Sequence, residues 1–165
     1  MRASIALILL GIFFVYVIYI EIDQDMASLL NERVKNAVNR ATHDASLCID
    51  TTEYSFGRIV FDQAIAPNTF KNTLALNLGL NQSDLSPKPK NVFTAKPTIE
   101  FIDYIDDNDG IIYPYLYENS TYGITKLLHG PSVISVVTIE KPVFCAFSAK
   151  FKYRKWAVYE YPIPK

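Results

Sequence analysis

The N-terminal part of the chain is an uninterrupted apolar run. From Ala3 to Ile20 no Asp, Glu, Lys or Arg occurs. At about 1.5 Å of rise per residue, a helix of this length crosses most of a hydrocarbon core of about 30 Å. The sequence therefore predicts a single-pass membrane protein in which residues 3–20 contact the membrane. Residues 1–25 would form the anchor and its juxtamembrane end.

Two interpretations of this run compete, an uncleaved signal anchor and a cleaved signal peptide. A signal peptide requires small residues at its cleavage site, whereas this run ends in Tyr19 and Ile20. We therefore favour the signal anchor. Because Arg2 precedes the run and the acidic Glu21 and Asp23 follow it, the positive-inside rule places the N-terminus in the cytoplasm and the C-terminal domain outside the cell membrane.

Beyond the apolar run, hydrophobic residues return every three or four positions, which is the helical period. The resulting stripe consists largely of small residues: Leu30, Val34, Ala37, Ala41 and Ala45. Small side chains permit the close approach of a sheet or another helix. No Pro or Gly interrupts residues 12–50, so we expect the apolar and amphipathic stretches to form one continuous helix.

A second helix is predicted at 67–78, where Phe70, Leu74 and Leu78 share one face and Gly79 ends the helix. Residues 80–91 are polar and contain two prolines, which predicts an extended surface linker. The helical region 26–79 would then join the part of the chain after the linker, residues 92–165, in one globular domain.

From residue 92 onward the hydrophobic period changes to alternation, which is typical of strands. Four or five strands are expected, with candidate ranges at 98–105, 111–117, 132–139, 143–151 and 155–161. Short turns between them indicate an antiparallel meander whose apolar face the amphipathic helix covers. The predicted fold class is therefore α+β, a long N-terminal helix packed on an antiparallel sheet.

Composition narrows the function classes. The chain has 165 residues, half of them hydrophobic, and a formal net charge of -1. This length allows one compact domain and excludes a multidomain enzyme. The apolar content excludes disorder, and the balanced charge provides no global basic field for nucleic acid.

Candidate catalytic groups are few, because the chain has two His and two Cys. A zinc site would need His43, Cys48, His129 and Cys145 together, but His43 and Cys48 lie about 140° apart around a helix. No nucleophile elbow and no phosphate-binding glycine loop is present. We therefore expect no enzyme activity, no catalytic residue, no metal, no cofactor and no small-molecule substrate.

An acidic cluster precedes Gly110 and consists of Asp103, Asp106, Asp107 and Asp109. Part of it matches the middle of an EF-hand loop, but Ile105 and Leu116 occupy the positions of the first and last calcium ligands. We interpret the cluster as an Asp-rich hairpin turn. An irregular calcium site is the alternative.

Three cations, Lys150, Lys152 and Arg154, alternate along the C-terminal sequence and would share one face of a strand. Such a face is a candidate contact for polyanions: wall polymer, lipid headgroups or nucleic acid. The alternative is a solvated edge strand whose charges oppose aggregation.

The two cysteines, Cys48 and Cys145, would both lie outside the cell. If the helix covers the sheet, they could form a disulfide closing a long loop. Two buried free thiols are the alternative.

A resemblance to a known group arises from this layout together with the segments 36–50, 70–78 and 130–133. A long helix, transmembrane in its first half and packed on a sheet in its second, resembles the type IV pilins and the single-span envelope proteins of the TadE type. The resemblance implies a pilin-like fold and a structural role in a bacterial pilus or secretion-type apparatus. A prepilin-peptidase site is not recognisable, because Gly11 is followed by Ile12 and Phe13 rather than by an early Glu.

Two functional classes follow from these observations. The first is a non-catalytic, membrane-anchored assembly subunit of a surface apparatus, in contact with other subunits. The second is a membrane-tethered binding module that recognises cell-wall polymer, DNA or a receptor through its sheet domain.

Overall fold

The structure is a computed structural model and describes residues 2–144 and 150–162. Its elements, in chain order, are α1 (Arg2–Ser46), α2 (Thr51–Ser55), α3 (Ala66–Leu78), β1 (Thr98–Ile105), β2 (Tyr115–Asn119), β3 (Ile124–Leu128), β4 (Ser132–Glu140) and β5 (Lys152–Glu160). A long helix with antiparallel strands confirms the predicted α+β class.

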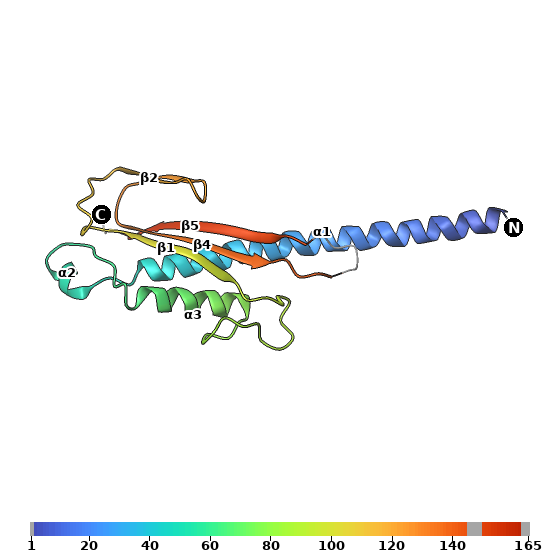
Figure 1. Ribbon diagram of the computed structural model, residues 1–165, viewed down its shortest axis with the longest axis horizontal. Coiled ribbons are helices and arrows are strands. Elements are labelled where there is room, and N and C mark those ends of the chain that lie inside the picture. Colours follow the sequence, from blue (N-terminus) through green and yellow to red (C-terminus); the bar gives the residue numbers. More distant parts are fainter. Residues whose placement is uncertain (1, 145–149, 163–165) are drawn as a thin grey trace.

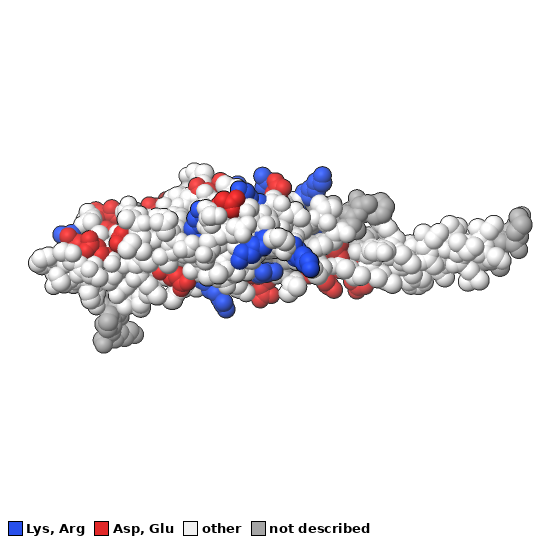
Figure 2. All heavy atoms as spheres, turned by 90° about the horizontal axis from the view of Figure 1, so that it is seen from below, with Lys and Arg blue, Asp and Glu red and all other residues white. Residues whose placement is uncertain are grey.

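The helix α1 is continuous over 45 residues. Its N-terminal half projects alone from the domain, whereas its C-terminal half lies beneath the sheet (Figure 1). Charged side chains gather over the domain, and most of the projecting helix is free of them in Figure 2. One helix therefore carries both the free apolar segment and the scaffold on which the domain is built.

The main sheet has three antiparallel strands in the order β1-β4-β5. The central strand β4 is buried from Ser132 to Ile139, and Ser135 is in register with Ile102 of β1 and Ala157 of β5. The expected meander is wrong, because β2 and β3 pair with each other in a separate two-stranded sheet. This hairpin leaves the sheet after β1, so β1 and β4 become neighbours.

The domain has three layers. The helices α1 and α3 cover one face of the main sheet, and their core includes Val34, Phe70 and Val137. The β2–β3 hairpin covers the other face through a second core that includes Ile124 and Ile134. Both faces of β4 are therefore buried, which explains why apolar residues such as Val133, Ile134, Val136 and Val137 occupy consecutive positions of the strand and do not alternate with exposed polar ones.

The hairpin also differs in its boundaries from the predicted strand at 111–117. The strand β2 starts only after Pro114, which has no N–H to donate to a ladder. The strand β3 was not predicted, because exposed residues such as Thr125 and Lys126 interrupt its apolar alternation.

The helix α3 includes the predicted range 67–78 and ends at Gly79, which adopts a left-handed conformation with φ 71°. Residues 80–91 contain none of the named helices or strands. They form a compact loop, whereas the sequence predicted an extended linker. Leu80 and Leu85 are buried, and the side-chain amide of Asn91 donates to the carbonyl oxygens of Leu78 and Gly79. The loop therefore belongs to the domain core.

The predicted strand at 143–151 is contradicted where the structure describes it. Val143, Phe144, Lys150 and Phe151 lie outside β4 and β5, and residues 145–149 lie outside the described residues. The pairing of β4 with β5 ends at Glu140 and Lys152, just before Pro142. The strand β5 begins at Lys152, three residues before the predicted start at 155.

Candidate functional site

The free half of α1 is the most unusual surface of the molecule. Its side chains are exposed from Ser4 to Tyr19, with Leu7 and Ile8 at 69% and 63% exposure. It is long and apolar enough to cross a membrane, a property that a signal sequence shares. An apolar surface of this extent is compatible with a single membrane span.

The predicted stripe on the second half of α1 is buried in the main core. Leu30, Val34, Ala37, Ala41 and Ala45 are each at most 2% exposed. This half of α1 packs against α3, β5 and β4. The small side chains allow two helices and the sheet to meet around one helix face.

A polar pair sits inside this apolar contact. The Thr42 hydroxyl donates to the carbonyl oxygen of Val38 at 2.7 Å, and its oxygen lies 2.6 Å from the Ser135 hydroxyl oxygen. Since the Thr42 proton is committed to Val38, Ser135 is the donor to Thr42. The pair joins α1 to β4 with both hydroxyl groups satisfied.

The base of the domain is tied to α1 next to the apolar run. The ammonium of Lys141, the first residue after β4, lies 2.6 Å from the Asp23 carboxylate, and the Lys141 side chain is 1% exposed. Nearby, the Tyr153 hydroxyl donates to the carbonyl oxygen of Ala27 at 2.9 Å. Burial, with a smaller contribution from the Asp23 charge, raises the pKa of Tyr153.

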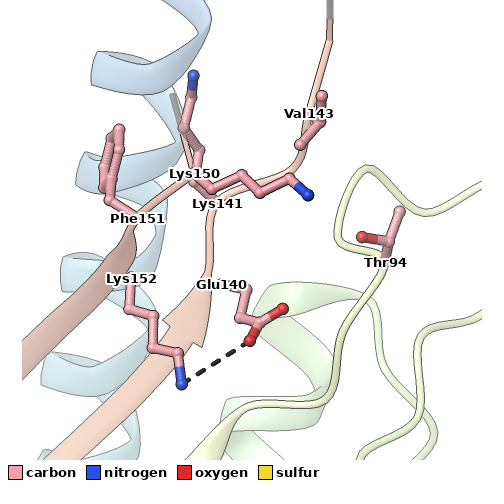
Figure 3. Close-up of a pocket in the computed structure, with 7 residues that line it drawn as sticks. All are labelled: Thr94, Glu140, Lys141, Val143, Lys150, Phe151 and Lys152. Carbon is pink, nitrogen blue, oxygen red and sulfur yellow. Dashed lines mark ion pairs between the residues drawn. The ribbon is translucent and has the colours of Figure 1, made fainter. Parts of the chain in front are cut away.

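A pocket of about 430 Å³ opens at this base. It is lined by Thr94, Glu140, Lys141, Val143, Lys150, Phe151 and Lys152. In Figure 3 the loop that carries Thr94 lies across the pocket from the β4–β5 connection. Lys152 and Glu140 form an ion pair at 3.8 Å with both side chains more than 60% exposed, so the pair adds little stability.

The predicted polyanion contact is divided between different surroundings. Lys150 and Lys152 line the basal pocket, and Lys152 is paired with Glu140. Arg154 lies over the Tyr122 ring of the hairpin, 5.9 Å from its centroid, and its Nε donates to the Thr138 hydroxyl. All three side chains are exposed, and the polyanion contact stays a prediction.

The Asp-rich turn after β1 holds a neighbouring segment through backbone amides. The buried Asp106 carboxylate accepts from the N–H groups of Phe61 and Asn108, and the Asp107 carboxylate accepts from Ile59 N–H at 2.7 Å. Among the described residues, no cluster of His, Cys, Asp and Glu is arranged to hold a metal ion. Through these hydrogen bonds the turn holds the backbone of residues 59–61 in place.

Asp103 has a different role from the rest of the acidic cluster. Its carboxylate accepts from the Tyr117 hydroxyl at 3.0 Å, which connects β1 to the hairpin. Burial is the main cause that raises the pKa of Tyr117 to about 12.

The structure places the histidines and the described cysteine at separate points. His43 packs edge-on against Tyr159, and His129 lies 3.7 Å from the Glu160 carboxylate. The Cys48 sulfur is 3.4 Å from the Thr69 hydroxyl oxygen. Cys145 lies outside the described residues, so the proposed disulfide stays a prediction.

Three features of the base and the core were absent from the sequence prediction: the Lys141–Asp23 pair, the Thr42–Ser135 pair and the hairpin. Ser135 interrupts an apolar run of β4, and Gly123 follows a polar turn between two short apolar runs. These two sequence features could have indicated the polar pair and the hairpin. No sequence feature around Lys141 indicated its pairing with Asp23. Comparisons with protein-family models, with curated proteins and with solved structures gave no match.

Proposed function

We propose that this protein is a non-catalytic, membrane-anchored structural or assembly subunit of a bacterial surface apparatus, of the pilus or secretion type. One observation carries the proposal: a single unbroken helix of 45 residues is free and apolar in its first half and forms the domain core in its second. Because the helix is continuous, the position of the domain is fixed relative to the helices or lipids that the apolar half packs against.

In this proposal the N-terminus is cytoplasmic, the domain is extracytoplasmic, and the apolar half of α1 packs laterally with other helices. Gly11 lies in the middle of that half, and a Cβ added there meets no atom within 4 Å. The isolated chain therefore tolerates a larger residue at this position, whereas a close helix–helix contact would not.

The alternative of a tethered binding module has less support. Part of its basis was a shared face of Lys150, Lys152 and Arg154, and two of these side chains also have partners within the domain. We therefore retain assembly as the proposed function.

The test is fractionation of sheared surface filaments against membranes, in cells with the gene deleted and then complemented. We expect the deletion to remove surface fibres and the native chain to restore them. Gly11→Leu should enter membranes but restore fewer fibres, with Ile12→Leu as the matched control. Unchanged fibres in the deletion strain would contradict the proposal.

A further inference from the structure

Two contacts fix the direction of β4 relative to α1. Ser135 contacts Thr42 near the C-terminal end of α1, and Lys141 contacts Asp23 at the base of the domain, next to the apolar run. The strand therefore runs antiparallel to α1 and points toward the apolar run. Asp23 lies only about 4.5 Å of helix rise beyond Ile20, the last residue of that run.

The chain that follows Lys141 continues in this direction. Figure 1 shows the described segment after β4, residues 141–144, extending past the end of the sheet in the direction of the N-terminal half of α1. The described residues of this connection consequently lie at the level where the apolar run ends.

These residues are unusually apolar for a surface loop. Val143 is 51% exposed, Phe144 40% and Phe151 45%. The Phe151 ring packs edge-on against Tyr153, with centroids 5.2 Å apart, and the Phe151 carbonyl oxygen accepts from the Lys141 N–H at 2.9 Å, which holds the backbone at Phe151 against the end of β4. Exposed apolar side chains of this kind, beside a helix able to span a membrane, match the composition of an interfacial insertion.

We propose that the described ends of the β4–β5 connection, residues 141–144 and 150–151, form a second membrane contact, with Val143, Phe144 and Phe151 entering the boundary between headgroups and acyl chains. The exposed Lys150 binds a phospholipid phosphate from the aqueous side. The inference rests on the proposed membrane anchoring by α1, and it adds that the domain sits directly on the same membrane. Two attachments would fix the tilt of the domain, which a single helix leaves free.

The charges at the base indicate which lipids are needed. Lys141 is matched by Asp23 and Lys152 by Glu140, while Glu21 and Asp25 are exposed nearby. Because acidic and basic groups are nearly balanced, insertion is driven by the apolar side chains. Phosphatidylcholine, which carries a phosphate but no net charge, should be sufficient.

The chain has one tryptophan, which allows a direct test by fluorescence. Trp156→Phe provides a background without tryptophan, into which Phe144→Trp introduces a reporter at the connection. The full chain is reconstituted in phosphatidylcholine vesicles, with and without bromine on the acyl chains. Ile112→Trp, 87% exposed in the segment after the Asp-rich turn, is the control outside the membrane. Phe13→Trp is the control within the span.

We expect bromolipids to quench the reporters at 144 and 13 and to leave the reporter at 112 unquenched. Quenching at 13 without quenching at 144 would overturn this inference and leave the anchor intact. An absence of quenching at both positions would overturn the anchor and the inference with it.

The phosphate contact is tested in the same reporter background. Lys150→Glu should lower quenching at position 144, whereas Lys150→Arg should retain it. Millimolar inorganic phosphate should have no effect if the ligand is the lipid headgroup. Equal quenching in Lys150→Glu and the parent would overturn the role of Lys150, and loss of quenching on addition of phosphate would contradict a lipid source.

Discussion

The hydroxyl groups of Thr42 and Ser135 lie 2.6 Å apart, both fully buried, where α1 crosses the central strand of the sheet. Ser135 donates to Thr42, which in turn donates to the carbonyl oxygen of Val38. The two side chains are therefore not equivalent. Loss of Thr42 leaves Ser135 without its acceptor, whereas loss of Ser135 leaves Thr42 bonded to Val38.

This asymmetry predicts the order of two substitutions. Thr42→Val should lower the free energy of unfolding by about 1–3 kcal/mol, because the Ser135 donor stays buried and unsatisfied. Ser135→Ala should cost less, about 0.5–1.5 kcal/mol. Denaturant unfolding of the full chain in detergent measures both, and the double variant should be more stable than the sum of the single effects indicates. Additive effects would show that the hydroxyl groups are not coupled.

The buried stripe on α1 predicts a cost of overpacking. Ala41 is fully buried in the main core, so Ala41→Leu should destabilise the domain by about 1–3 kcal/mol and lower its melting temperature. The exposed Asn36 on the same helix is the control, since Asn36→Leu should leave the melting temperature nearly unchanged. An unaltered melting temperature in Ala41→Leu would refute the packing of this stripe within one chain.

The ion pair at the base predicts a strong dependence on Asp23. Asp23→Asn removes the Asp23 carboxylate charge from the buried Lys141 ammonium, and loss of one member of a buried pair costs about 3–5 kcal/mol. Asp25→Asn, at an exposed position two residues away, should have little effect. Thermal unfolding of the two variants distinguishes them, and the further change Lys141→Met should recover part of the loss. Equal stability of both Asn variants would contradict a buried pair.

Alkaline pH should destabilise the domain in a defined range. Burial is the main cause that raises the pKa values of Tyr104, Tyr113 and Tyr117 from 10 to about 12. Above pH 10 the unfolded chain loses these phenolic protons while the folded chain retains them, so stability falls as pH rises toward 12. The stability contributed by the neutral rings is complete below pH 10.

Tyr104 provides the specific check on this pH dependence. Its hydroxyl is buried and finds no hydrogen-bond partner among the residues that the structure describes. Tyr104→Phe should therefore retain or raise stability at neutral pH and reduce the loss between pH 10 and 12. Denaturant midpoints measured across this range test both effects. A pH profile identical to that of the native chain would show that Tyr104 does not contribute.

Much of the fold could be predicted because its hydrophobic periods are strong. The stripe from Leu30 to Ala45 repeats at helical spacing over several turns, and β1 has the predicted boundaries 98–105. The hairpin was missed because β3 is short and carries Thr125 and Lys126 in its middle. Local pattern indicates that a strand exists, but it does not specify which strand it pairs with.

The base of the domain could not be predicted for a different reason. Lys141 and Asp23 are separated by 118 positions in the chain, and their contact depends on the register between β4 and α1. Similarly, the alternation of Lys150, Lys152 and Arg154 suggested one face, whereas the strand begins only at Lys152 and the hairpin covers part of the sheet face carrying Arg154. Tertiary packing decided the surroundings of each charge.

The measurement that tests the account most directly is the membrane topology of the full chain. A reporter active only outside the cytoplasm is fused after Lys165, and a matched fusion places it before Met1. We predict activity for the C-terminal fusion alone, with the protein retained in membranes after alkaline extraction. Activity of the N-terminal fusion alone, or release of the protein by alkaline extraction, would contradict anchoring by α1 with the domain outside.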